Sequence, residues 1–123
     1  MIQINQDDLL LQKSNFDVVK KVAFQIQKDF QLYDEKMNLS GASETAYDEL
    51  FEQVKPIIFR MLELDSSRFF SLLYAIDVDE RKVKTILFGK KESDVAMEIT
   101  HLILERELLK VMSRQIFSQQ INI

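Results

Sequence analysis

Apolar residues recur at steps of three and four residues through most of this chain, and that spacing places them along one side of a helix. Three long segments carry the pattern, at about residues 15–39, 43–64 and 93–118. Two short segments, at about 66–77 and 79–88, lie between the second and third long ones. The pattern therefore predicts five helices, three long and two short.

Residues that commonly cap helices stand where these segments begin. The candidate caps are Ser14 or Asn15, Ser43, Asp65 with Ser66, Asp77 or Asp79, and Ser93. Gly41 lies in the loop expected at 38–43, and Gly89 follows the fourth segment, as glycine often follows a helix. The caps and the apolar spacing thus indicate the same boundaries.

The second long segment contains Pro56, the only proline of the chain. Proline lacks an amide donor and clashes with the preceding turn, so it kinks a helix or ends it. Val54, Ile58 and Met61 keep the apolar spacing in phase across this position. One helix kinked at Pro56 is therefore favoured, and two helices meeting near Lys55 are the alternative.

The first short segment is apolar on more than one face, which predicts that it is the most buried element. Its large apolar residues are Phe69, Phe70, Leu72, Leu73 and Ile76. Aromatic residues here and in the next segment are interpreted as core rather than as the lining of a ligand cavity: Phe69, Phe70, Tyr74 and Phe88.

The last segment has a long apolar side that narrows at residues 105–107, where Glu105, Arg106 and Glu107 follow one another. Its apolar positions are Val95, Ile99, Leu102, Ile103, Leu109, Met112 and Ile116. The terminal stretches 1–13 and 119–123 show no pattern long enough to assign, and we expect them to be irregular.

These features predict an all-α fold, a small helical bundle formed by a single domain over residues 1–123. The 123 residues include only 2 glycines and 1 proline, so turn formers are scarce. The chain has no cysteine, which excludes disulfides and thiol chemistry. It has no apolar run of membrane-spanning length and no signal-like start, so we expect a cytoplasmic protein without a membrane span.

Charge is distributed unevenly along the chain. Residues 41–80 carry three cations and nine anions, whereas residues 81–123 carry eight cations and five anions. An acidic middle and a net charge of −4 disfavour nucleic acid as a partner. Five cations cluster early in the basic end, either as a solvated face or as a contact for an acidic partner: Arg81, Lys82, Lys84, Lys90 and Lys91.

The sharpest local pattern is Glu98, His101 and Glu105, which share one helix face. Glu-x-x-His is the spacing of di-iron carboxylate bundles, but such sites take two of these pairs from two helices. This chain has a single histidine, so no metal, cofactor or catalytic site is predicted here. A structural histidine is favoured, because no motif ties His101 to a nucleophile.

Asp77 and Asp79 resemble the opening of a calcium loop. The resemblance ends at Arg81 and Lys82, which stand where the loop needs an oxygen ligand and a glycine. The two aspartates are therefore interpreted as helix caps and helix-end charges.

The sequence favours a non-catalytic helical protein-interaction module that self-associates, as a homodimer, or binds another protein. Apolar residues near the C-terminus that lack an evident partner within the chain are the candidate interface: Met112, Ile116 and Phe117. The alternative is a bundle that binds a small molecule or a metal through Glu98, His101 and Glu105. A nucleic-acid regulator is the least favoured function.

Overall fold

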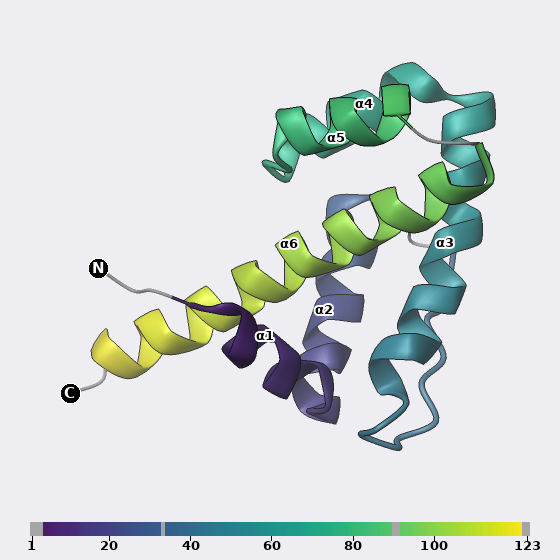
Figure 1. The fold of residues 1–123 in the computed structure, drawn as a ribbon. Coiled ribbons are helices and arrows are strands. Elements are labelled where there is room, and N and C mark those ends of the chain that lie inside the picture. The colour runs from purple at the N-terminus through teal and green to yellow at the C-terminus, as the bar shows by residue number, and fades with distance from the viewer. Residues whose placement is uncertain (1–3, 33, 90–91, 122–123) are drawn as a thin grey trace. The chain divides into compact units, whose positions relative to one another are not determined.

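The computed structural model describes residues 4–32, 34–89 and 92–121, and these residues form six helices and no strand (Figure 1). The helices are α1 (Gln6–Lys13), α2 (Phe16–Asp29), α3 (Ala46–Leu64), α4 (Ser66–Ala75), α5 (Glu80–Gly89) and α6 (Glu92–Ile121). The all-α prediction is confirmed. The predicted number of five helices is wrong, because the N-terminal segment is also helical.

The chain forms two compact units. The terminal unit comprises Met1–Leu50 with Glu107–Ile123, and the central unit comprises Phe51–Arg106. The division falls within α3 and within α6, so each of these helices contributes residues to both units. That the chain folds as a single domain stays a prediction.

Helix α1 corrects the expectation that residues 1–13 are irregular. The Asn5 side chain accepts a hydrogen bond from the Asp8 amide at 2.9 Å, and the Asp8 carboxylate accepts one from the Asn5 amide at 3.1 Å. This reciprocal capping box satisfies two amides that the first turn leaves open. Only Leu9 of the helix is buried, so the sequence of this segment shows no apolar stripe that would predict a helix.

Helix α2 ends at Asp29, ten residues earlier than the apolar spacing predicts. Gln31 adopts a left-handed backbone conformation with φ of 54°, and the Leu32 amide donates to the Gln27 carbonyl at 2.8 Å. The Gln31 amide donates to the Lys28 carbonyl at 3.2 Å. These two bonds form a Schellman motif, in which the chain turns away after the last helical turn.

Side-chain hydrogen bonds hold the connection between α2 and α3 at both of its ends. Gln27 donates a side-chain hydrogen bond to the Glu35 carbonyl. Near α3, Glu49 accepts from the Ser40 amide at 2.6 Å, the Ser40 hydroxyl at 2.7 Å and the Thr45 hydroxyl at 2.5 Å. The hydrogen bonds from Thr45 and Ser40 lower the pKa of Glu49.

Helix α3 runs through Pro56 as one element and not as two helices that meet near Lys55. The kink expected at Pro56 stays a prediction. Pro56 is exposed. The buried residues Val54, Ile57 and Ile58 continue the core face past the proline.

Helix α4 is not the most buried element, which corrects the sequence interpretation. Phe69 and Leu73 are buried, but Phe70 is 44% exposed and Tyr74 is 89% exposed. Phe88 at the end of α5 is 86% exposed, so it is not a core residue either. Phe69 and Leu73 are four residues apart on one helix face, and Phe70 and Tyr74 share a different face, which is exposed.

The last helix begins near the predicted start and extends to Ile121, so residues 119–121 are helical rather than irregular. Its buried positions follow helical spacing over most of its length: Ala96, Ile99, Thr100, Ile103, Leu104, Glu107, Leu108, Val111 and Met112. Glu107, which lies in the polar interval 105–107, belongs to this buried stripe.

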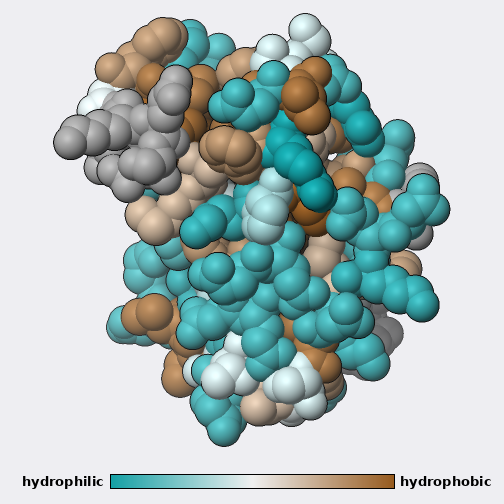
Figure 2. All heavy atoms as spheres, turned by 90° about the vertical axis from the view of Figure 1, so that its right-hand side faces the viewer, coloured by the Kyte–Doolittle hydropathy of each residue, from teal (hydrophilic) through white to brown (hydrophobic). Residues whose placement is uncertain are grey.

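The surface carries hydrophobic residues in separate patches among hydrophilic ones, as the face drawn in Figure 2 shows. In the terminal unit the most exposed large apolar residues are Leu10, Leu11, Phe24 and Phe117, and in the central unit they are Leu64, Tyr74 and Phe88. No helix in the described part of the chain is long and apolar enough to cross a membrane.

Candidate functional site

A groove between α2 and the C-terminal part of α6 is the first candidate site, and it lies within the terminal unit. We call it the α2–α6 groove. Its walls are formed by the end of α1, by the residue before α2, by α2 and by α6: Gln12, Asn15, Asp17, Val18, Lys20, Lys21, Phe24, Gln25, Lys28, Val111, Arg114, Gln115 and Ser118. Four of these residues are cations and one is a carboxylate, so the groove is basic in a chain whose net charge is −4.

A cation–apolar–cation stripe follows one side of α2 along this groove. Lys20, Phe24 and Lys28 are four residues apart, a spacing that aligns side chains on one helix face. The Phe24 side chain is 69% exposed, although α2 buries other apolar residues fully. An exposed aromatic ring between two cations gives the groove both an apolar anchor and a charged rim.

A series of polar contacts leads inward from the wall of the groove. Arg114 donates to the Gln25 side-chain oxygen at 2.5 Å, and the Gln25 amide donates to Asp29 at 2.8 Å. Lys110 donates to the other oxygen of the Asp29 carboxylate at 3.1 Å. The side chains of Asp29 and Lys110 are only 17% and 19% exposed, so this ion pair is shielded from water more than a surface pair is.

Glu107 is the last residue in this series of contacts and is fully buried. The Lys110 ammonium approaches its Oε1 atom at 3.7 Å, and no hydrogen-bond donor among the described residues reaches either carboxyl oxygen. Burial and the neighbouring Asp29 carboxylate raise the pKa of Glu107 to about 8, although Lys110 acts in the opposite direction. Glu107 is therefore largely protonated at neutral pH.

The pKa of Asp29 is shifted in the opposite direction. Burial acts to raise the pKa of its carboxyl group, but Glu107, Lys110 and Gln25 outweigh burial and hold that pKa below its usual value. When protonated, Glu107 acts as a donor toward Asp29, and Lys110 and Gln25 already donate to it. Two adjacent carboxyl groups thus differ in protonation at neutral pH, and Asp29 is the charged one.

The second candidate site is a pocket of about 550 Å³ within the central unit. It is lined by Arg81, Lys82, Thr85 and Ile86 of α5 and by Glu98, His101 and Leu102 of α6. We call it the α5–α6 pocket. It brings together two of the three residues singled out in the sequence, Glu98 and His101, whereas Glu105 does not line it.

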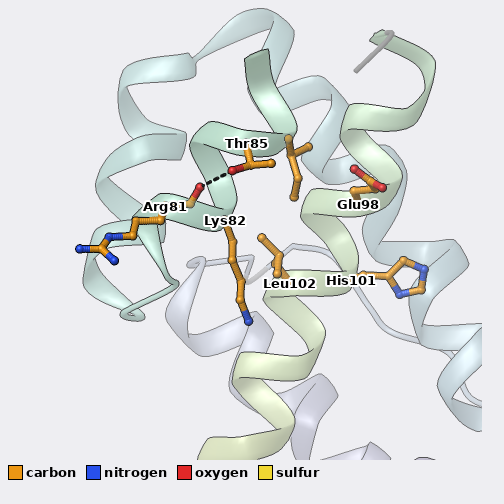
Figure 3. Close-up of a pocket in the computed structure, with 7 residues that line it drawn as sticks. Arg81, Lys82, Thr85, Glu98, His101 and Leu102 are labelled. Atoms are coloured by element: carbon orange, nitrogen blue, oxygen red, sulfur yellow. Dashed lines mark hydrogen bonds between the residues drawn. The ribbon is translucent and has the colours of Figure 1, made fainter. Parts of the chain in front are cut away.

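Figure 3 shows how the polar side chains lie around the α5–α6 pocket. Arg81 and Lys82 leave α5 on one side, Glu98 and His101 leave α6 on the other, and Leu102 lies between them. The His101 ring packs on the Phe51 ring with centroids 4.4 Å apart. Among the described residues, no three histidine, cysteine, aspartate or glutamate side chains are grouped to hold a metal ion.

The remaining residues of interest from the sequence have structural partners. Asp79 accepts a hydrogen bond from the Arg81 amide at 2.9 Å at the start of α5, which is the cap predicted for it. Asp77 is 3.7 Å from the guanidinium group of Arg106. Lys84 pairs with Glu80 at 3.2 Å on the surface of α5. Lys90 and Lys91 of the basic cluster lie outside the described residues.

The predicted C-terminal interface residues differ in exposure. Met112 is buried, so the expectation that it lacks a partner within the chain is wrong. Ile116 is half-buried, and Phe117 is 57% exposed. Of the three residues, Phe117 therefore offers most of the surface that a partner could cover.

Glu107 and the α2–α6 groove were not singled out in the sequence. A signal for Glu107 was present, because it falls at helical spacing between Ile103, Leu104 and Val111. The groove joins residues about 90 positions apart, so only the fold brings them together. Comparisons of the chain with family models, with curated proteins and with solved structures found no match.

Proposed function

We propose that this chain is a non-catalytic protein-interaction module that binds an acidic, amphipathic helical segment of another protein in the α2–α6 groove. The observation that carries the proposal is the stripe formed by Lys20, Phe24 and Lys28, with Phe24 69% exposed in a groove that holds four cations and one carboxylate.

The chemistry of the groove selects this occupant. An apolar side chain that covers Phe24 removes apolar surface from water, and acidic side chains four residues to either side face Lys20 and Lys28. Such complementary charge speeds association and excludes basic partners. Arg114, on the opposite wall, is held by Gln25 and is already oriented when the partner arrives.

The test is a binding titration with a designed helical peptide that carries Glu, Leu and Glu at four-residue steps. We expect saturable binding that weakens with added salt, because the rim contacts are exposed charges. A peptide with Lys in place of Glu, and a scrambled peptide of the same composition, should not bind.

Matched variants locate the binding. Phe24→Ser should weaken binding of the acidic peptide at least about tenfold, as loss of an aromatic anchor usually does. Leu11→Ser is its control, because Leu11 is 71% exposed in the same unit and does not line the groove. Lys28→Glu should weaken binding, and Lys36→Glu, in the exposed connection, should not.

Other outcomes would overturn the proposal. Equal binding of the scrambled peptide would show that the groove attracts any anion. Tighter binding of a single-stranded oligonucleotide or of anionic lipid vesicles than of the acidic peptide would assign the groove to a different class of partner.

A further inference from the structure

Helix α1 of the terminal unit presents apolar side chains to solvent. Leu10 is 59% exposed and Leu11 is 71% exposed, whereas Leu9, on another side of the helix, is buried. Asp7 is exposed and lies four residues before Leu11, so the two side chains share one face and stand about 6 Å apart along the helix axis. We call the face formed by Asp7, Leu10 and Leu11 the outer face of α1.

The outer face of α1 matches the α2–α6 groove in charge and in spacing. Phe24 is the exposed apolar residue of the groove, and Lys20 and Lys28 lie four residues to either side of it. When Leu11 covers Phe24, Asp7 lies one helical turn away, beside one of the two lysines. The outer face is thus an acidic, amphipathic helical segment of the kind that the groove is proposed to bind.

The groove that takes this face belongs to a second copy of the chain. Neither Leu10 nor Leu11 lines the groove of its own chain, although Gln12 of the same helix does. Helix α1 begins in a capping box, and only Ser14 and Asn15 join it to α2, so its place beside its own groove is fixed. The outer face is therefore open to another molecule.

We propose that the chain self-associates by docking the outer face of α1 from one copy into the α2–α6 groove of a second copy, with Leu11 over Phe24 and Asp7 beside a lysine of the groove. The inference rests on the proposed function of the groove and names a second copy as one of its occupants. The contact also regulates the groove, because a docked α1 excludes any other partner. Few large side chains form the contact, so the association is weak.

The test measures the mass of the full chain by sedimentation equilibrium at concentrations up to about 1 mM, where a weak complex is populated. We expect reversible association of the wild type. Leu11→Ser and Phe24→Ser should each raise the dissociation constant at least about tenfold, because each removes one side of the apolar contact. Tyr74→Ser is the control, because Tyr74 is 89% exposed in the central unit and belongs to neither surface.

A mixture of the two variants tests the docking directly. Leu11→Ser keeps an intact groove and Phe24→Ser keeps an intact outer face, so a complete contact forms only between unlike copies. We expect the equimolar mixture to form a complex of one copy of each variant, at concentrations where each variant alone is monomeric.

A charge variant tests the acidic end of the outer face. Asp7→Asn should weaken the self-association severalfold. Asp48→Asn is the matched control, because Asp48 is also an exposed carboxylate in the first turn of a helix of the terminal unit.

Three outcomes would overturn the inference. A wild type that is monomeric at the highest concentration rejects the self-association, and binding of the acidic peptide to that same protein would leave the proposed function standing. A mixture that stays monomeric while the wild type associates would place the contact elsewhere. Association that a saturating acidic peptide does not diminish would mean that α1 does not occupy the groove.

Discussion

The Lys110 ammonium lies 3.1 Å from the half-buried Asp29 carboxylate and 3.7 Å from the buried Glu107 carboxyl group, so one cation stands between two acids. The shorter contact goes to Asp29, which also accepts from Gln25. Lys110 therefore stabilises a charge on Glu107 less than the charge on Asp29. Lys110 is the only adjacent cation that the described contacts provide. This arrangement explains why Glu107 keeps its proton at neutral pH while Asp29 does not.

Protonation of Glu107 should make the stability of the chain depend on pH. Its pKa is about 8 in the folded chain against 4.5 for an ordinary glutamate. Between these values the folded state holds a proton that the unfolded state has lost, so the free energy of unfolding should fall as pH rises. The slope is at most about 1.4 kcal/mol per pH unit.

Urea unfolding of the wild type and of Glu107→Gln at several pH values from 5 to about 8 measures this effect. The glutamine cannot ionise, so its free energy of unfolding should depend less on pH than that of the wild type. Parallel slopes in the two proteins would show that Glu107 does not titrate in this window.

Removal of the Lys110 charge should lower the free energy of unfolding. Lys110→Met leaves the Asp29 carboxylate, which is 17% exposed, without its cation, and we expect a loss of up to about 3 kcal/mol in the free energy of unfolding. Lys84→Met is the matched control, because the Lys84–Glu80 pair is exposed and should contribute about 1 kcal/mol or less. Similar losses for the two variants would contradict the shielded ion pair.

Neighbouring phenylalanines of α4 should differ in their contribution to stability. Phe69 is fully buried and Phe70 is 44% exposed, so Phe69→Ala should cost about 3–5 kcal/mol and Phe70→Ala much less. Leu73→Ala should cost about 2–5 kcal/mol. Denaturant midpoints rank the three variants, and a larger effect at Phe70 than at Phe69 would reverse the orientation assigned to α4.

Substitutions at two C-terminal residues should distinguish an effect on folding from an effect on self-association. Met112→Asp places a charge at a buried position and should cost about 3 kcal/mol or more in stability. Phe117→Asp alters an exposed position and should leave stability nearly unchanged while it weakens any homodimer. Sedimentation equilibrium measures the second effect, and a monomeric wild type would reject self-association through this surface.

The helical class of the fold could be predicted because apolar spacing and caps agree over most of the chain. The boundary after α2 could not, because Gln31 takes the left-handed position that glycine usually marks. Asp77 does the same after α4, with φ of 62°. Residues without a glycine's freedom reach this conformation only where the surrounding hydrogen bonds hold them, which the sequence does not display.

The candidate sites could be predicted only in part. Glu98 and His101 share a helix face, so their proximity follows from spacing alone. That they line one pocket with Lys82, and that Phe24 lines one groove with Arg114, depends on how separate helices pack. The sequence shows Glu107 as one of three consecutive polar residues, and its helical spacing to Ile103, Leu104 and Val111 is the only sign there of its burial.

The most direct measurement of the proposed function is NMR mapping of the acidic helical peptide on the full chain. We predict that resonances of Phe24, Lys28 and Gln115, which line the α2–α6 groove, shift saturably and that the charge-inverted peptide leaves them unchanged. Shifts centred instead on Tyr74 and Phe88 of the central unit, or no saturable shift, would contradict the assignment of the groove as the binding surface.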